Sequence, residues 1–180
     1  MENTLSLTKY WLETIVIGLN LCPFAKIPLD SGQIRLVECT DDSEDEQMSF
    51  FLEELEILNQ VEPDDINTTL IVYPNASEDF VSFNDFVGEL EEMLEEAELS
   101  DVFQLVAFHP KFFFGHLPPE HLGNLVNRAP YPTLHILRSD EVARALKHPK
   151  EGEMISFAND KKLHDLSIET INQLFYYLKK

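Results

Sequence analysis

Apolar side chains recur at helical spacing in three stretches of the first hundred residues. The first stretch predicts an amphipathic helix over residues 5–19, which ends near Gly18-Leu19-Asn20. The second helix begins after Ser43, because Ser43 and Glu46 have the spacing of a capping box and acidic residues fill the first turn. The third helix has its apolar face at Phe80, Phe83, Val87, Leu90, Leu94 and Ala97.

Four shorter apolar runs, rich in β-branched and aromatic residues, are typical of strands. They lie at residues 33–40, 68–74, 102–108 and 132–138. The first three runs alternate with the second and third helices, which predicts βαβ units and at least partly parallel pairing. Two short helical segments are expected after the last strand. The pattern indicates one α/β domain over residues 1–180, with a mixed, mostly parallel sheet of about four strands flanked by helices.

The composition fits a soluble globular protein, with 44% hydrophobic and 26% charged residues among 180. The first residues carry no secretory signal, and no apolar stretch is long enough to cross a bilayer. Two cysteines, Cys22 and Cys39, are too few for a disulfide framework. We therefore expect a reduced protein of the cytoplasm that does not associate with membranes.

The net charge of −20 is concentrated in one part of the chain. Residues 36–110 contain 22 Asp or Glu and no Lys or Arg. Such a field repels the phosphate backbone, so nucleic acid is excluded as a partner. The acids fit the solvent faces of the second and third helices, where they favour solubility. Docking of a basic protein partner is the alternative interpretation.

The segment between the third and fourth strands is the first candidate for chemistry. Residues 109–131 are longer than an ordinary connection, and segments of that length are often functional. The segment begins with His109 at the expected carboxyl end of a strand, where open α/β sheets bind ligands. Titratable and basic residues gather here and in the following strand: His109, His116, His121, Arg128, His135 and Arg138.

A second candidate is Cys22, which precedes Pro23. Proline suits the first position of a helical turn. If such a turn forms, Cys22 is its N-cap and the helix dipole favours the thiolate. If Cys22 instead belongs to the end of the preceding helix, the dipole opposes that charge.

Three motifs carry a resemblance to a known family: "LNLCPFA" near the N-terminus, "FHP" after the third strand, and "NRAPYPTLHILR". In this order and in a chain of this length, they resemble the bacterial domain-of-unknown-function family fourteen-fifteen. The family pattern reads NRSPYP, so Ala129 stands where the pattern has a serine hydroxyl. The resemblance covers nearly the whole chain and implies a cytoplasmic bacterial protein. It places Cys22, His109, Asn127, Arg128 and His135 in shared motifs, and it brings no activity and no cofactor.

The leading hypothesis is an enzyme with a thiol nucleophile. Cys22 would attack an acyl or similar carbon, and His109 or His135 would take the thiol proton. Asn127 would orient the imidazole, and Arg128 would hold a carboxylate or phosphate of a small anionic substrate. The remaining substrate-binding residues would be Phe24, Tyr131 and Arg138. This hypothesis requires Cys22, His109 and Arg128 to surround one concavity.

Two alternatives remain open at this point. A metal site would use His109, His116, His121 and His135, with Cys22 as a further ligand, although these spacings match no zinc signature. A binding module without catalysis would capture an anion in a basic pocket with Cys22 in its floor. Without a functional role, His135 can be a hydrogen-bonded core residue, and Arg128 can hold the long segment together through its carbonyls.

Overall fold

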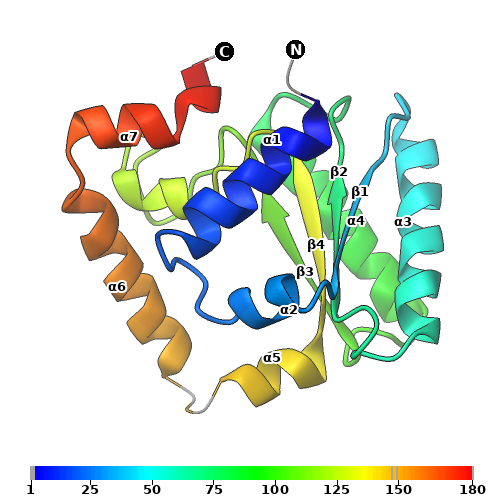
Figure 1. Cartoon of the computed structure of the whole chain (residues 1–180). Coiled ribbons are helices and arrows are strands. Elements are labelled where there is room, and N and C mark those ends of the chain that lie inside the picture. The colour runs from blue at the N-terminus through cyan, green and yellow to red at the C-terminus, as the bar shows by residue number, and fades with distance from the viewer. Residues whose placement is uncertain (1–2, 147, 149, 180) are drawn as a thin grey trace.

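A four-stranded β-sheet runs through the middle of the molecule, with helices on both of its faces (Figure 1). The structure is a computed structural model that describes residues 3–146, 148 and 150–179. The strands are β1 (Ile34–Glu38), β2 (Thr68–Val72), β3 (Phe103–Phe108) and β4 (Thr133–Arg138). None of the described helices is both long enough and apolar enough to span a membrane.

Helices precede, connect and follow these strands. Before β1 come α1 (Thr4–Tyr10), the π-helix η1 (Trp11–Ile17) and α2 (Lys26–Asp30). Between strands lie α3 (Glu44–Gln60), α4 (Phe80–Glu96) and the 3-10 helix η2 (Leu122–Asn127). After β4 come α5 (Ser139–Ala145), α6 (Glu151–His164), α7 (Ile168–Leu174) and the 3-10 turn η3 (Tyr176–Lys179).

The strand order is β1-β2-β4-β3. β1 and β2 pair in parallel, whereas β4 pairs antiparallel with both β2 and β3. The expected single α/β domain with a mixed four-stranded sheet is confirmed, but the sheet is not mostly parallel, since one of its three pairs is parallel. The βαβαβ pattern correctly gives β1, β2 and β3 one direction. It could not reveal that β4 inserts between β2 and β3 in the opposite direction.

Two apolar cores lie on opposite faces of the sheet. The first is formed by α3 and α4 against side chains such as Ile71, Leu134 and Ile136. The second is formed by α1, η1 and the C-terminal helices against Leu70 and Phe108. Because strand side chains alternate between the faces, His135 lies on the same face as its partner Leu70, the face of the second core.

Local patterns explain where the central elements begin and end. The Ser43 side chain accepts from the Glu46 backbone N–H, so Ser43 is the expected N-cap, and its hydroxyl donates to the Glu46 carboxylate in place of the backbone N–H of a full capping box. All five residues of β2 are buried, as expected for a continuous apolar run in the middle of a sheet. The third predicted helix forms as α4, and its apolar face enters the first core.

The two ends of the chain differ from the predicted elements. The helix expected over residues 5–19 continues from α1 into η1, which has π-helical hydrogen bonding. It ends at Gly18, where a Cβ would collide with the Thr14 carbonyl oxygen, and Asn20 turns the chain with a φ of 50°. After β4, three α-helices and a 3-10 turn replace the two segments expected. α6 has a weak apolar stripe because it buries only Asn159 and Leu163.

Candidate functional site

A cavity of about 720 Å³ opens between the second-core face of the sheet and the elements that cover it. The sheet contributes the floor through Thr68, Leu70 and His135. The walls come from η1, the 21–28 segment, α5 and the end of η2, which are far apart in the sequence. Most of the lining side chains are apolar: Trp11, Leu12, Val16, Leu21, Ile27, Ile34, Val106, Phe108, Val126, Leu137 and Val142 are among them.

Cys22 lies in the wall of this cavity and is half-buried. It begins a turn in which the Ala25 N–H donates to the Cys22 carbonyl oxygen. The short α2 starts after this turn with Ala25 as its N-cap, so Cys22 does not have the N-cap position that Pro23 suggested. The segment before Cys22 is held by α6, because Asn159 donates a 2.7 Å hydrogen bond to the Leu21 carbonyl.

His135 faces the cavity from the middle of β4. Its Nε2 lies 2.6 Å from the Thr68 hydroxyl oxygen, and that hydroxyl lies 2.6 Å from the Ile136 carbonyl oxygen. The hydroxyl has one proton, which it donates to the carbonyl, so it accepts the proton on His135 Nε2. Nδ1 is therefore an unprotonated acceptor, and it has no hydrogen-bond partner among the described residues. Burial lowers the pKa of His135 to about 4, so the ring is neutral at pH 7.

Three further predicted residues line the same cavity: Phe24, Asn127 and Arg138. The side-chain amide of Asn127 makes no hydrogen bond to the rest of the described structure. The Arg138 guanidinium is occupied, because it donates to carbonyl oxygens at and just after the C-terminus of α3, those of Leu58 and Val61, at 2.6 and 2.7 Å. Arg138 thus caps α3 and offers the cavity mainly its side-chain stem.

His109 lies away from the cavity, on the opposite side of the sheet. It is 1% exposed and packs against Phe80 and Phe83 of α4. Its Nε2 donates to the Ser77 carbonyl oxygen, and its Nδ1 accepts from the Lys111 N–H at 3.0 Å. Burial lowers its pKa. Both ring nitrogens are used internally, so the structure does not bring His109 together with Cys22.

Arg128 also lies outside the cavity lining. Its guanidinium donates to the carbonyl oxygens of Phe112 and Pro119, at 3.0 and 2.5 Å. Arg128 therefore ties the long 109–131 segment together, and the expected convergence of Cys22, His109 and Arg128 on one concavity is wrong. Tyr131 packs on the edge of the second core and does not line the cavity either.

Residues that the sequence did not single out complete the site. Trp11 is 1% exposed, lines the cavity, and carries an indole N–H with no partner among the described residues. It belongs to η1, and π-helical turns are rare and frequent at functional sites. Thr68 fixes the tautomer of His135. In the sequence, Trp11 looks like an ordinary apolar residue of a helix. Thr68 comes close to His135 only through the register in which β2 pairs with β4.

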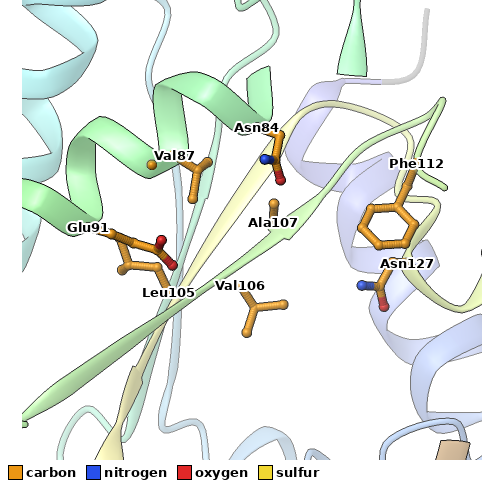
Figure 2. A pocket seen from close by; sticks show the side chains of 9 residues that line it. Asn84, Val87, Glu91, Leu105, Val106, Ala107, Phe112 and Asn127 are labelled. Carbon is orange, nitrogen blue, oxygen red and sulfur yellow. The ribbon is translucent and has the colours of Figure 1, made fainter. Parts of the chain in front are cut away.

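A second, smaller hollow of about 270 Å³ lies at the free edge of β3. Figure 2 shows Asn84, Val87 and Glu91 of α4 along this groove, with Phe112 and Asn127 at its other end. Asn127 lines both hollows, so it stands between the groove and the main cavity. The groove holds no histidine or cysteine among its lining residues, and the predicted chemistry does not fall there.

The alternative metal set does not assemble. His109 and His135 lie on opposite sides of the sheet, and His116 is exposed in the long segment. His121 instead lies beside Asp160 and His164 of α6, where the three residues offer ligand atoms within 4.8 Å of one another. This is the single such group in the part of the chain that the structure describes.

Comparison with known proteins gives one match. A family model described as "Protein of unknown function (DUF1415)" matches residues 3–173. No curated protein and no solved structure matches the chain.

Proposed function

Since this chain belongs to the DUF1415 family, whose description assigns no activity, we propose from the cavity that the protein binds a small, uncharged and largely apolar organic molecule. The observation that carries the proposal is a cavity of about 720 Å³ whose lining is mostly apolar and includes ten polar residues. Sites for small molecules occupy roughly 300–1,000 Å³ and have this kind of lining.

The hydrogen-bonding groups of the cavity indicate which donors and acceptors a ligand should carry. His135 Nδ1 is a fixed acceptor, so it suits a hydroxyl or amide N–H of the ligand. The Trp11 N–H is a buried donor without a described partner, and a ligand oxygen that reaches it would satisfy it. Asn127 can donate and accept. An uncharged ligand with a hydroxyl and a carbonyl group fits this set.

The charges around the cavity argue against the small anionic ligand that the sequence suggested. Arg128 and Arg138 donate to backbone carbonyls. Arg144, at the rim, is paired with Glu141, and Asp64 adds a second carboxylate to the lining. No cation in the described lining is left to hold a carboxylate or phosphate, and a neutral His135 does not supply one.

The single tryptophan makes the proposal testable, since Trp11 lines the cavity. We expect at least one member of a panel of uncharged small molecules with apolar bodies to change Trp11 fluorescence in a saturable way. Val142 lies in the wall on α5, a helix with no buried residue, so Val142→Phe fills part of the cavity at little cost to folding. This variant should weaken binding at least fivefold.

The matched control is Val81→Phe. Val81 is exposed on α4, on the other face of the sheet, so the same substitution there should leave binding unchanged. If no compound of the panel gives a saturable response, the cavity is not a ligand site. The same conclusion follows if both variants weaken ligand binding equally.

Thiol chemistry is the second candidate, supported by the presence of Cys22, Asn127 and His135 in one lining. Cys22 Sγ would bond to an acyl carbon of the ligand with loss of its leaving group, and His135 Nδ1 would take the thiol proton. A base with a pKa of about 4 takes that proton poorly, which is why we place ligand binding first. A covalent adduct on Cys22 in the intact mass spectrum, absent from Cys22→Ser, would reverse this order.

A further inference from the structure

A cluster of three side chains lies outside the cavity, between η2 and α6. His121 is the N-cap of η2, and Asp160 and His164 lie one turn apart on α6. The two elements pack against each other, and the His121 and His164 rings meet edge to face at 4.9 Å. The cluster therefore joins residues about 40 positions apart in the sequence through three groups that bind metals.

The distances in the cluster suit a small cation. Asp160 Oδ1 lies 3.7 Å from Nδ1 of His121 and 3.5 Å from Nδ1 of His164. Ligand atoms at about 2.0–2.2 Å from a tetrahedral Zn²⁺ lie about 3.3–3.6 Å from one another. Both distances to Asp160 are thus within a few tenths of an ångström of that spacing, and the ligand atoms of all three residues lie within 4.8 Å of one another.

Two observations indicate that the cluster lacks a positive partner. Asp160 Oδ1 is buried and accepts no hydrogen bond from any described residue. His121 Nδ1 accepts from the Gly123 N–H at 3.1 Å, so this nitrogen is unprotonated, and a metal bound to it would replace that hydrogen bond. A carboxylate oxygen and an unprotonated imidazole nitrogen therefore lie 3.7 Å apart with no proton between them.

The chain also leaves space beside these atoms. A Cβ at Gly123 would stand 2.7 Å from Asp160 Oδ1 and 3.0 Å from His121 Nδ1, so a larger residue would press into the cluster. His164 Nδ1 donates to the Asp160 carbonyl oxygen at 2.9 Å, and this surface histidine can give up that bond for a metal.

We propose that His121, Asp160 and His164 form a site for a divalent transition metal, with Zn²⁺ as the best-fitting ion. Two imidazoles and one carboxylate suit Zn²⁺, and three protein ligands leave its fourth position open to water or another ligand. The metal would tie α6 to η2, whose last residues, Val126 and Asn127, line the main cavity. The proposal stands independently of the ligand in that cavity.

The test is a Zn²⁺ titration of the full chain without a histidine tag, stripped of metal and read by competition with a chromophoric chelator. We expect one Zn²⁺ per chain, and binding at least tenfold weaker in His164→Ala and in Asp160→Asn. His116→Ala is the matched control, since His116 is an exposed histidine outside the cluster, and it should bind as the unchanged protein does.

Two further readouts guard against a folding defect. Zn²⁺ should raise the melting temperature of the unchanged protein and of His116→Ala but not of the two cluster variants, because an ion that binds the folded state stabilises it. Co²⁺ should give the visible absorption of a four-coordinate site in the same two proteins. Absence of stoichiometric Zn²⁺, or equal loss in His116→Ala, would overturn the proposal and leave the cluster as a set of ordinary polar contacts.

Discussion

At the scale of single residues, His135 has the most consequential environment in the molecule. Its proton sits on Nε2, held by Thr68, and burial keeps the ring neutral. The sequence allows two roles for this histidine, a base or a satisfied core residue. The geometry combines features of both, because one nitrogen is satisfied by the fold and the other faces a cavity.

The low pKa of His135 predicts a specific dependence of stability on pH. The unfolded chain gains a proton at His135 near pH 6.5, whereas the folded chain does so only near pH 4. The contribution of the neutral ring is therefore complete above pH 6.5 and is lost as the pH falls toward 4. The difference between these two pKa values corresponds to at most about 3.5 kcal/mol of stability. Urea unfolding between pH 4 and 7 should show this loss, and His135→Phe should reduce it.

His135→Phe is a suitable variant because it leaves no buried group stranded. The Thr68 hydroxyl still donates to the Ile136 carbonyl, and the new ring enters a largely apolar cavity. We expect its stability at pH 7 to change by less than about 1 kcal/mol. His109 has a lowered pKa too and remains as an internal reference. An unchanged pH profile in the variant would show that His135 is not kept neutral.

The two cysteines differ in a way that alkylation can measure. Cys39 is 1% exposed, and burial raises its pKa to about 11, so few thiolates form there near pH 8. Cys22 is half-buried in the cavity wall. Iodoacetamide should therefore modify Cys22 faster than Cys39 in the native protein, as read by peptide mass spectrometry. Labelling of Cys39 at the same rate would contradict the burial described here, and a bound cavity ligand should slow labelling of Cys22.

Part of the candidate site can be predicted from the residues alone. Cys22, Phe24, Asn127, His135 and Arg138 stand out by type and neighbours, and all line the cavity. His109 and Arg128 stand out for the same reasons, yet their side chains bond to backbone groups and stabilise the fold. The sequence shows that a side chain is chemically capable of catalysis or binding. It does not show whether the hydrogen-bonding atoms of that side chain are already bonded to backbone groups. That depends on chain segments such as Ser77 and Pro119, whose position only the fold determines.

At the scale of elements, the 109–131 segment is an ordered structure rather than a free loop. Asn124 is fully buried, accepts from the Phe114 N–H and donates to the carbonyls of Pro118 and Pro119. Arg128 adds two further bonds to carbonyls of the segment. The length of the segment thus reflects an internal hydrogen-bond network that supports η2 and, with it, one wall of the cavity.

Removal of the Arg128 side chain should therefore affect stability more than ligand binding. Arg128→Ala deletes two charge-assisted hydrogen bonds, and we expect a loss of about 2 kcal/mol in urea unfolding. Arg144→Ala is the control, because Arg144 is exposed and its direct pair with Glu141 is of the kind that contributes less than about 1 kcal/mol. Equal effects of the two substitutions would show that Arg128 does not hold the segment.

The helices and strands themselves follow from the sequence with two kinds of exception. The apolar spacing over residues 5–19 predicts a helix but carries no sign of its π-helical half, since the difference lies in which carbonyl each N–H reaches. The fourth strand is evident from "PTLHILR", but its neighbours are not. Strand order depends on which strand edges remain open after the βαβ units form, and the spacing of apolar residues does not indicate this.

At the scale of the whole molecule, the acidic residues form one layer. Most of the 22 acids between residues 36 and 110 fall on α3 and α4, which together cover one face of the sheet (Figure 1). With a net charge of −20, the protein should not bind DNA or RNA at physiological salt. A gel-shift titration at micromolar protein, with and without added salt, checks this expectation, and a salt-sensitive shift would contradict it.

The position of β4 also sets the order in which the chain completes its fold. β2 pairs with β4 across about 65 residues, and β4 is the partner through which β3 joins the sheet. While the ribosome has not yet released residues 133–138, β2 keeps one open edge and β3 is unpaired, and both are apolar. Such edges recruit other chains. A nascent chain that ends before β4 therefore leaves these strand edges open, and the sheet is completed only by the late, long-range insertion of one strand between two others.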